Sequence, residues 1–188
     1  MSSAVKTIPG HYIYELDEGK PIYYKGYKQD LSQNINLDPK GSSLLQSLII
    51  TQLVVLLHQK LSDQYHILTN ELGLQLSKGN RRAADIAIFE KKQLSTAQIA
   101  NKYTNVPPKV VIEIDTKAEI EVIQDTFAYY NRKTEQLLGF GVKKVIWVFT
   151  DTQKVLIASP EQDWQLINWS KEIEIWDEVY VVIPNLLP

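Results

Sequence analysis

The spacing between apolar residues changes along this chain. Its first two patterned segments predict a β-hairpin and a helix. Residues 12–16 alternate, residues 17–20 form a polar turn, and residues 21–25 return, which is typical of a β-hairpin. The next apolar stretch, residues 44–61, is apolar nearly all the way round a helix and follows the capping-box signal Ser43 to Gln46. A helix of that kind packs on more than one side, so we expect it to lie between a sheet and a partner subunit, as in a homodimer.

Strand patterns dominate the rest of the chain. The expected strands are residues 66–68, 72–77, 83–89, 110–115, 145–149, 154–158, 164–167 and 178–183. Between the two most apolar of them, residues 120–139 predict a helix, which would end at Gly139 or Gly141 in a left-handed cap. A strand–helix–strand crossover requires a parallel strand pair. The pattern therefore predicts an α/β fold: a mixed sheet flanked by helices, with an N-terminal hairpin and C-terminal β strands.

Composition narrows the class of protein. A length of 188 residues fits one domain, with a β-rich lead at 1–40, a core at 41–160 and a β tail at 161–188. The chain has no cysteine, which excludes a thiolate metal site and a cysteine nucleophile. Its start lacks an apolar signal region, and residues 44–57 are too short and polar to span a bilayer, so we expect a cytoplasmic protein. A net charge of -2 argues against avid, sequence-independent binding of nucleic acid.

Charged residues inside the apolar strands are the best candidates for chemistry. Asp85 lies within residues 83–89, and Glu113 and Asp115 lie within residues 110–115. A carboxylate in such a run is costly to bury unless it is paired or binds a metal. Two carboxylates on neighbouring strands and one lysine are sufficient for metal-assisted phosphodiester hydrolysis. The alternative is that these carboxylates lie at strand ends in ordinary ion pairs.

Lys133 is the candidate lysine. Tyr129, Lys133 and Leu137 follow each other at intervals of four residues, so they share one helix face. Lys133 therefore lies on the apolar stripe that faces the sheet, where it either extends to the rim or meets a carboxylate. Glu113, on the strand that precedes this helix, is a suitable partner. The histidines show no ligand spacing, which favours structural roles for all of them: His11, His58 and His66.

Four segments carry a resemblance to a known family. Residues 82–88 (Arg-Ala-Ala-Asp-Ile-Ala-Ile) match an Arg-x-Pro-Asp strand, and residues 107–114 match a Pro-x-x-x-x-x-Glu-Val strand. Residues 133–142 match a Lys-x-x-x-Tyr-x-x-x-Gly-Val helix end, and residues 145–148 match the strand that follows. In this order and spacing they resemble the restriction-endonuclease-like PD-(D/E)XK superfamily, and within it the Uma-two family of predicted endonucleases. The resemblance implies a restriction-endonuclease-like core.

The resemblance also implies a metal centre. Carried across, it places a divalent cation, Mg²⁺ or Mn²⁺, on Asp85 and Glu113. The Ile114 carbonyl is a further expected ligand, because hard cations take oxygen ligands. Asp115 would complete the shell or bind a second ion.

A catalytic lysine usually lies two residues after the glutamate in this superfamily, and here Asp115 stands at that position. The resemblance implies that the following helix supplies it, which assigns the role to Lys133, with Lys117 as the rival. The lysine would orient the attacking water or stabilise the transition state electrostatically. Glu15 is a possible additional carboxylate, although nothing in the sequence singles it out.

The expected function is therefore a metal-dependent endonuclease that hydrolyses phosphodiester bonds of nucleic acid, with DNA as the expected substrate. Two alternatives remain open. The first is a catalytically degenerate nuclease fold that acts as a binding or regulatory module. The second is a structural dimer scaffold whose interface is the helix at residues 44–61 and whose charges form ordinary ion pairs. Fold alone does not decide among them.

Overall fold

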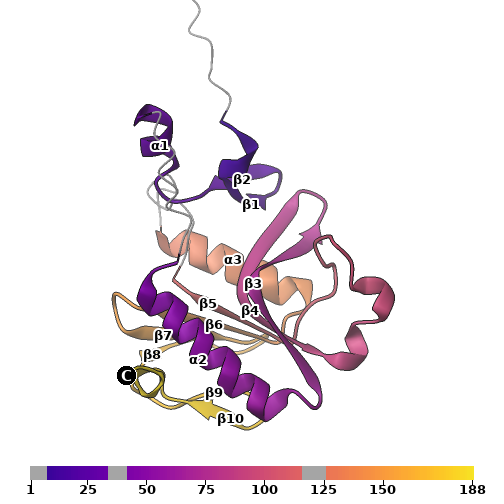
Figure 1. The fold of residues 1–188 in the computed structure, drawn as a ribbon, viewed down its shortest axis with the longest axis vertical. Helices are drawn as coiled ribbons and strands as arrows, with labels where there is room; N and C mark the ends of the chain where they lie inside the picture. The colour runs from indigo at the N-terminus through magenta and orange to yellow at the C-terminus, as the bar shows by residue number, and fades with distance from the viewer. Residues whose placement is uncertain (1–7, 34–41, 116–125) are drawn as a thin grey trace, which may run out of the picture.

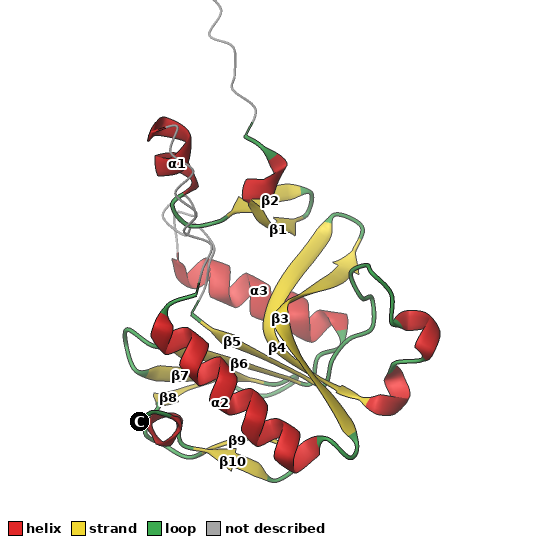
Figure 2. Cartoon of the chain, in the orientation of Figure 1, coloured by secondary structure: helices red, strands yellow, loops and turns green. Residues whose placement is uncertain are grey.

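The computed structural model describes residues 8–33, 42–115 and 126–188 (Figure 1). A mixed sheet is flanked by helices, as expected from the sequence (Figure 2). Short 3-10 turns connect several of the elements. In chain order the helices and strands are β1 (Ile13–Asp17), β2 (Lys20–Tyr23), α1 (Tyr27–Gln33), α2 (Leu44–Leu61), β3 (Tyr65–Ser77), β4 (Asn80–Glu90), β5 (Val110–Ile114), α3 (Thr126–Phe140), β6 (Lys144–Phe149), β7 (Lys154–Ala158), β8 (Gln165–Asn168), β9 (Ile173–Trp176) and β10 (Val179–Val181).

The main sheet has the order β2-β1-β4-β5-β6-β7-β8, and β3 pairs with β4 along its other edge. β5 and β6 are parallel, which confirms the predicted crossover through α3. The other pairs of this sheet are antiparallel. β9 and β10 form a separate two-stranded sheet, and the sequence pattern did not predict β9. β1 and β5 pair with different parts of one edge of β4. They leave a short part of that edge without a neighbouring strand, and this part matters most for the site.

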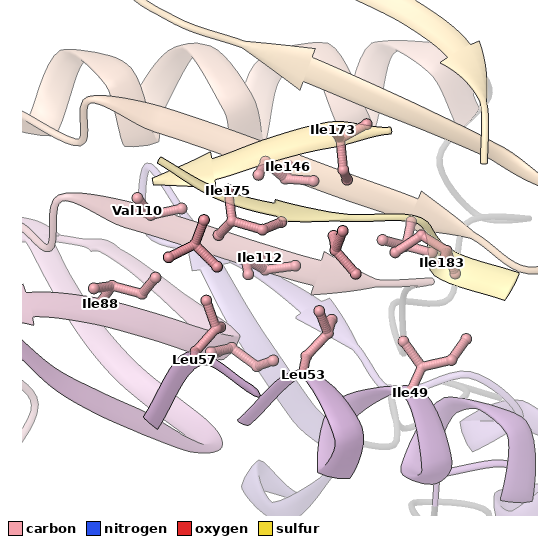
Figure 3. Packing of buried hydrophobic residues seen from close by; sticks show 14 of the residues in the cluster. Ile49, Leu53, Leu57, Ile88, Val110, Ile112, Ile146, Ile173, Ile175 and Ile183 are labelled. Carbon is pink, nitrogen blue, oxygen red and sulfur yellow. The ribbon is translucent and has the colours of Figure 1, made fainter. Parts of the chain in front are cut away.

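Two apolar clusters lie on the two faces of the sheet. One gathers Ile49, Leu53 and Leu57 of α2 with the isoleucines and valines of β4, β5, β6, β9 and β10 (Figure 3). The other gathers Tyr129 and Leu137 of α3 with side chains of β4, β5, β6 and β7. The central strands β4, β5 and β6 are therefore covered on both sides, which explains why β5 is apolar at every position except Glu113.

The predicted helix at residues 44–61 is confirmed as α2. Ser43 caps it, because its side-chain oxygen accepts a hydrogen bond from the Gln46 N–H at 3.1 Å. Its buried side chains repeat every three to four residues on one face, while Leu44 and Val55 are exposed. Of the described helices, α2 is the one long and apolar enough to cross a membrane by length and composition, a test that core helices also pass.

Backbone conformation explains several boundaries. The hairpin turn has positive φ at both Glu18 and Gly19, the geometry that two-residue turns favour. Gly141 has a φ of 119° directly after α3, which confirms one of the two predicted caps, whereas Gly139 lies inside the helix. α1 was not predicted. The predicted second helix starts at residue 120, and its positions 120–125 lie outside the described residues.

The two predicted strands at residues 66–68 and 72–77 form one long strand, β3. Asn70 and Glu71 interrupt its pattern, because both have positive φ and form a β-bulge. Pairing passes from Thr69 with Ile86 to Leu72 with Ala84, so the two bulged residues lie opposite Asp85.

Candidate active site

The site forms where the edge of β4 has no neighbouring strand. β1 pairs with this edge at Arg81 and β5 pairs with it from Ile86 onward, which leaves residues 82–85 between them. We call this segment the β4 gap. Side-chain carboxylates bond to backbone N–H groups at this gap. Glu15 Oε1 accepts from the Ala83 N–H at 3.0 Å, and Asp85 Oδ2 accepts from the Ile114 N–H at 2.8 Å. These bonds fix both carboxylates in place.

Lys133 lies at the centre of the site and is fully buried. Its Nζ lies 2.8 Å from Glu15 Oε1 and 3.1 Å from Glu113 Oε1. The rings of Tyr14 and Trp147 flank the ammonium group at 5.7 and 5.3 Å. Burial alone would lower the pKa of Lys133, but Glu113 and Glu15 outweigh it and raise that pKa. Lys133 therefore meets a carboxylate, as one of the two sequence alternatives required, and it stays protonated.

Glu15 is surrounded by donors. Besides the Ala83 N–H, its carboxylate accepts hydrogen bonds from Arg82 Nη1 and from the Tyr129 hydroxyl, both at 2.9 Å, while its contact with Lys133 is an ion pair. Burial opposes its ionisation, yet Lys133 and Arg82 lower its pKa. The sequence did not single out Glu15. Its position in a hairpin strand of alternating pattern is the one sequence feature that indicates burial.

Glu113 is buried to the same degree but has far fewer donors. Extending the pairing of Ile86 with Ile112 by one residue places Glu113 opposite Asp85. Burial raises the pKa of Glu113; Lys133 opposes this, while Asp85 and Glu15 raise the pKa further. Its Oε1 has no hydrogen-bond donor among the described residues, because the contact with Lys133 is an ion pair without hydrogen-bond geometry. Glu113 is therefore a buried carboxyl group whose charge is incompletely compensated.

Asp85 lines a pocket of about 270 Å³ between the first turns of α2 and the bulge of β3. Ser47 and Thr51 form the helix wall, and Asn70 and Glu71 form the opposite wall. A β-bulge beside an active site commonly redirects a side chain. Here the bulge lies across from Asp85, so this carboxylate borders a space that a ligand can enter.

The Ile114 carbonyl has a partner that the sequence analysis missed. Gln46 Nε2 donates to this oxygen at 2.6 Å, and the Gln46 side chain is buried. The capping-box pattern placed that side chain on the backbone of Ser43, but in the structure only the Ser43 half of the box is formed. Gln46 thus ties α2 to the end of β5, and the second lone pair of the carbonyl oxygen remains for another ligand.

Asp115 lies at a φ of 56° directly after β5. Its two carboxylate oxygens accept hydrogen bonds from the backbone N–H and the hydroxyl of Thr150, at 2.8 and 2.7 Å. These contacts direct the side chain to the end of β6, and the structure does not bring it into the Glu15–Lys133–Glu113 cluster. Its role as a ligand stays a prediction. Lys117 lies outside the described residues.

The donor set fits a hard cation held partly by backbone. Within residues 8–33, 42–115 and 126–188, no three His, Cys, Asp or Glu side chains are grouped closely enough to hold a metal. Mg²⁺, however, commonly takes only one or two carboxylates and keeps several waters. Asp85, Glu113 and the Ile114 carbonyl supply oxygen alone, and Glu113 Oε1, which has no hydrogen-bond donor among the described residues, is an atom that a cation would satisfy.

Comparisons with known proteins agree with this fold. Residues 33–179 match the family model Uma2, described as "Putative restriction endonuclease", so the chain belongs to that family. Five solved chains match significantly. One of them is described as a putative nuclease belonging to DUF820 from Anabaena variabilis ATCC 29413. It is 17% identical, with a TM-score of 0.69 over 97% of this chain and 93% of that chain. No curated protein matches.

Proposed function

We propose that this protein is a metal-dependent nuclease that hydrolyses phosphodiester bonds of nucleic acid, with DNA as the substrate. Asp85, Glu113 and the Ile114 carbonyl would hold Mg²⁺ or Mn²⁺. The observation that carries this proposal is the state of Glu113: a buried carboxyl group with a raised pKa and an oxygen without a hydrogen-bond donor. The ion pair with Lys133 does not remove this deficit, whereas a bound metal cation would offset it.

The bound cation would lower the pKa of a water molecule and offset charge on the scissile phosphate. The residues of the chain do the rest. Lys133 is protonated, so it does not act as a base; it donates to the water or to the phosphate and stabilises the developing negative charge. Glu15 holds Lys133 in place, and the rings of Tyr14 and Trp147 limit where its ammonium group can move.

Asp115 has the weaker claim to the metal. Its bonds to Thr150 hold the ends of β5 and β6 together, and a second ion would have to displace them. We therefore assign it first to positioning Ile114 and second to an additional ion. Lys133 takes precedence over Lys117 as the catalytic lysine because of its contact with Glu113.

We also propose a cytoplasmic homodimer. The exposed Leu44, Leu45 and Val55 side chains of α2 support a partner on that face. Analytical ultracentrifugation of the wild type and of Val55→Asp tests this part by itself. A dimer that dissociates in the variant agrees with it, and a monomeric wild type contradicts it.

One observation favours a second function. Lys133 already provides a positive charge beside Glu113, as it would in a nuclease fold that has lost its metal. In that case the protein would be a binding or regulatory module. The structural-scaffold alternative is less well supported, because Glu113 Oε1 has no hydrogen-bond donor among the described residues.

Cleavage of supercoiled plasmid and of single-stranded DNA with Mg²⁺ or Mn²⁺ tests the nuclease proposal. We expect nicking by the wild type and by the control Glu172→Gln, an exposed site, and its loss in Glu113→Ala and Lys133→Ala. Circular dichroism confirms that each variant is folded. Cleavage that survives in both site variants, or no cleavage by the folded wild type on DNA or RNA, contradicts the proposal.

A further inference from the structure

A second pocket, of about 210 Å³, lies between the β1–β2 hairpin and the β3–β4 hairpin. Tyr14 and Glu15 connect it to the active site, because they also contact Lys133. Glu71 lines this pocket and also the pocket that contains Asp85. The bulge of β3 thus separates two neighbouring pockets. A single linear polymer that runs past Glu71 would occupy both of them.

Arg81 in the wall of this pocket has no ion-pair partner among the described residues, although Glu15 and Glu71 line the same pocket. Within the part of the chain that the structure describes, its guanidinium forms no ion pair and no hydrogen bond; it lies over the Tyr103 ring, 5.4 Å from the ring centre. The other two arginines behave differently, since Arg82 pairs with Glu15 and Asp17, and Arg132 pairs with Asp17 and Glu18. A partly buried arginine beside a pocket without a carboxylate partner is suited to an anion or to a stacked base.

Tyr103 is held in place by its neighbours but stays half exposed. The ring packs on Gly73, where an added Cβ would come within 2.4 Å of it. The next residue, Thr104, is bonded to β3, donating to the Gly73 carbonyl at 3.0 Å and accepting from the Gln75 N–H at 2.8 Å. Despite this fixed backbone, Tyr103 is 49% exposed. A rigid, half-exposed aromatic ring is a suitable platform for a nucleobase.

We propose that this pocket binds one unpaired nucleotide of the substrate strand. The base stacks on Tyr103, Arg81 contributes its guanidinium to the stack or to the adjacent phosphate, and Glu71 accepts from amino groups of the base. Tyr24 orients Glu71, since its hydroxyl donates to Glu71 Oε2 at 3.0 Å. A paired base cannot present its face to Tyr103, so the nucleotide must be single-stranded or flipped out of a duplex. This inference rests on the nuclease function proposed above.

Single-stranded oligonucleotides that contain 2-aminopurine test the pocket. Titrations in EDTA report binding without cleavage, because 2-aminopurine fluorescence changes when the base stacks on an aromatic ring. We expect a saturable change with single-stranded probe and a much weaker one with blunt duplex. Tyr103→Ala and Arg81→Ala should each weaken binding about tenfold, in line with the loss of one stacked base. Gly73→Ala should act like Tyr103→Ala, since the new Cβ displaces the ring.

Tyr180→Ala and Lys143→Ala are matched controls, because both residues are exposed on other parts of the chain. They should bind as the wild type does. Equal binding of probe by the wild type and Tyr103→Ala overturns the inference, even if the wild type cleaves DNA. Binding that depends on Tyr103 and Arg81 in a protein that cleaves nothing supports the nucleotide pocket and contradicts the nuclease proposal, so the two failures are distinguishable.

Discussion

Glu15 and Glu113 contact the same buried lysine but lie in opposite electrostatic surroundings. Glu15 accepts hydrogen bonds from Arg82, Ala83 and Tyr129 and pairs with Lys133, and its pKa is lowered. Glu113 has Lys133 as its one ion-pair partner among the described residues, and its pKa is raised. Each carboxyl group is almost completely buried, so the number of donors, and not burial, makes the difference.

The difference in donors indicates a structural role for one carboxyl group and a ligand-binding role for the other. A buried carboxylate with all its lone pairs satisfied stabilises the fold and has little capacity for a ligand. A buried carboxyl group with an unsatisfied oxygen opposite a second carboxylate costs stability until a cation binds. We therefore assign Glu15 to holding the hairpin and the lysine, and Glu113 to holding the metal.

Glu15→Gln should give the largest loss of stability. It leaves the buried cations Arg82 and Lys133 with less counter-charge, which typically costs roughly 3–5 kcal/mol. Urea unfolding measures the change, with Glu172→Gln as the exposed control. Because the pKa of Glu15 is lowered, its contribution is present above the ordinary value of 4.5 and is lost as the pH falls through the folded-state value. A loss of stability no larger than that of Glu172→Gln would contradict the structural role of Glu15.

Glu113→Gln should behave in the opposite way. Without metal, we expect its free energy of unfolding to stay within about 1 kcal/mol of the wild type or to exceed it. Because the pKa of Glu113 is raised, the wild type loses stability as the pH rises above 4.5, and the variant does not. The advantage of the variant should thus grow between pH 4.5 and neutral pH in EDTA. A variant as unstable as Glu15→Gln would mean that Glu113 is a structural ion-pair partner.

Tyr129→Phe should cost less stability than Glu15→Gln. It removes one donor to Glu15 while Arg82, Ala83 and Lys133 remain, which costs about 1–2 kcal/mol. Thermal unfolding of this variant and of the exposed control Tyr180→Phe measures the cost. A stability equal to that of the control would show that the Glu15 donor set is redundant, and the contrast with Glu113 would weaken.

Sequence patterns predicted much of this arrangement. Helix α2, the parallel pair β5–β6 and the position of Lys133 on the sheet-facing side of α3 follow from periodicity, because each depends on local spacing. Asp85 and Glu113 were identified because a carboxylate within an apolar strand is rare. Their arrangement on neighbouring strands was predictable, since β4 and β5 are joined by one connection.

Other features depend on contacts distant in sequence. Glu15 lies in a hairpin with ordinary alternation, and only its contacts with Arg82 and Lys133 reveal its position in the site. Gln46 matches a capping box, and that local role gave no reason to expect its hydrogen bond to the Ile114 carbonyl. The sequence pattern predicts a break between strands where Asn70 and Glu71 form a bulge, because positive φ at residues other than glycine leaves no clear sequence signal.

Mn²⁺ binding tests the central claim most directly. Isothermal titration of the wild type, Glu113→Gln and the exposed control Glu172→Gln with Mn²⁺ measures affinity without any substrate. The account predicts one binding event that is retained in Glu172→Gln and lost in Glu113→Gln, a variant that should stay folded. Equal Mn²⁺ affinity in all three proteins, or no binding by the wild type, would contradict the assignment of Glu113 to a metal.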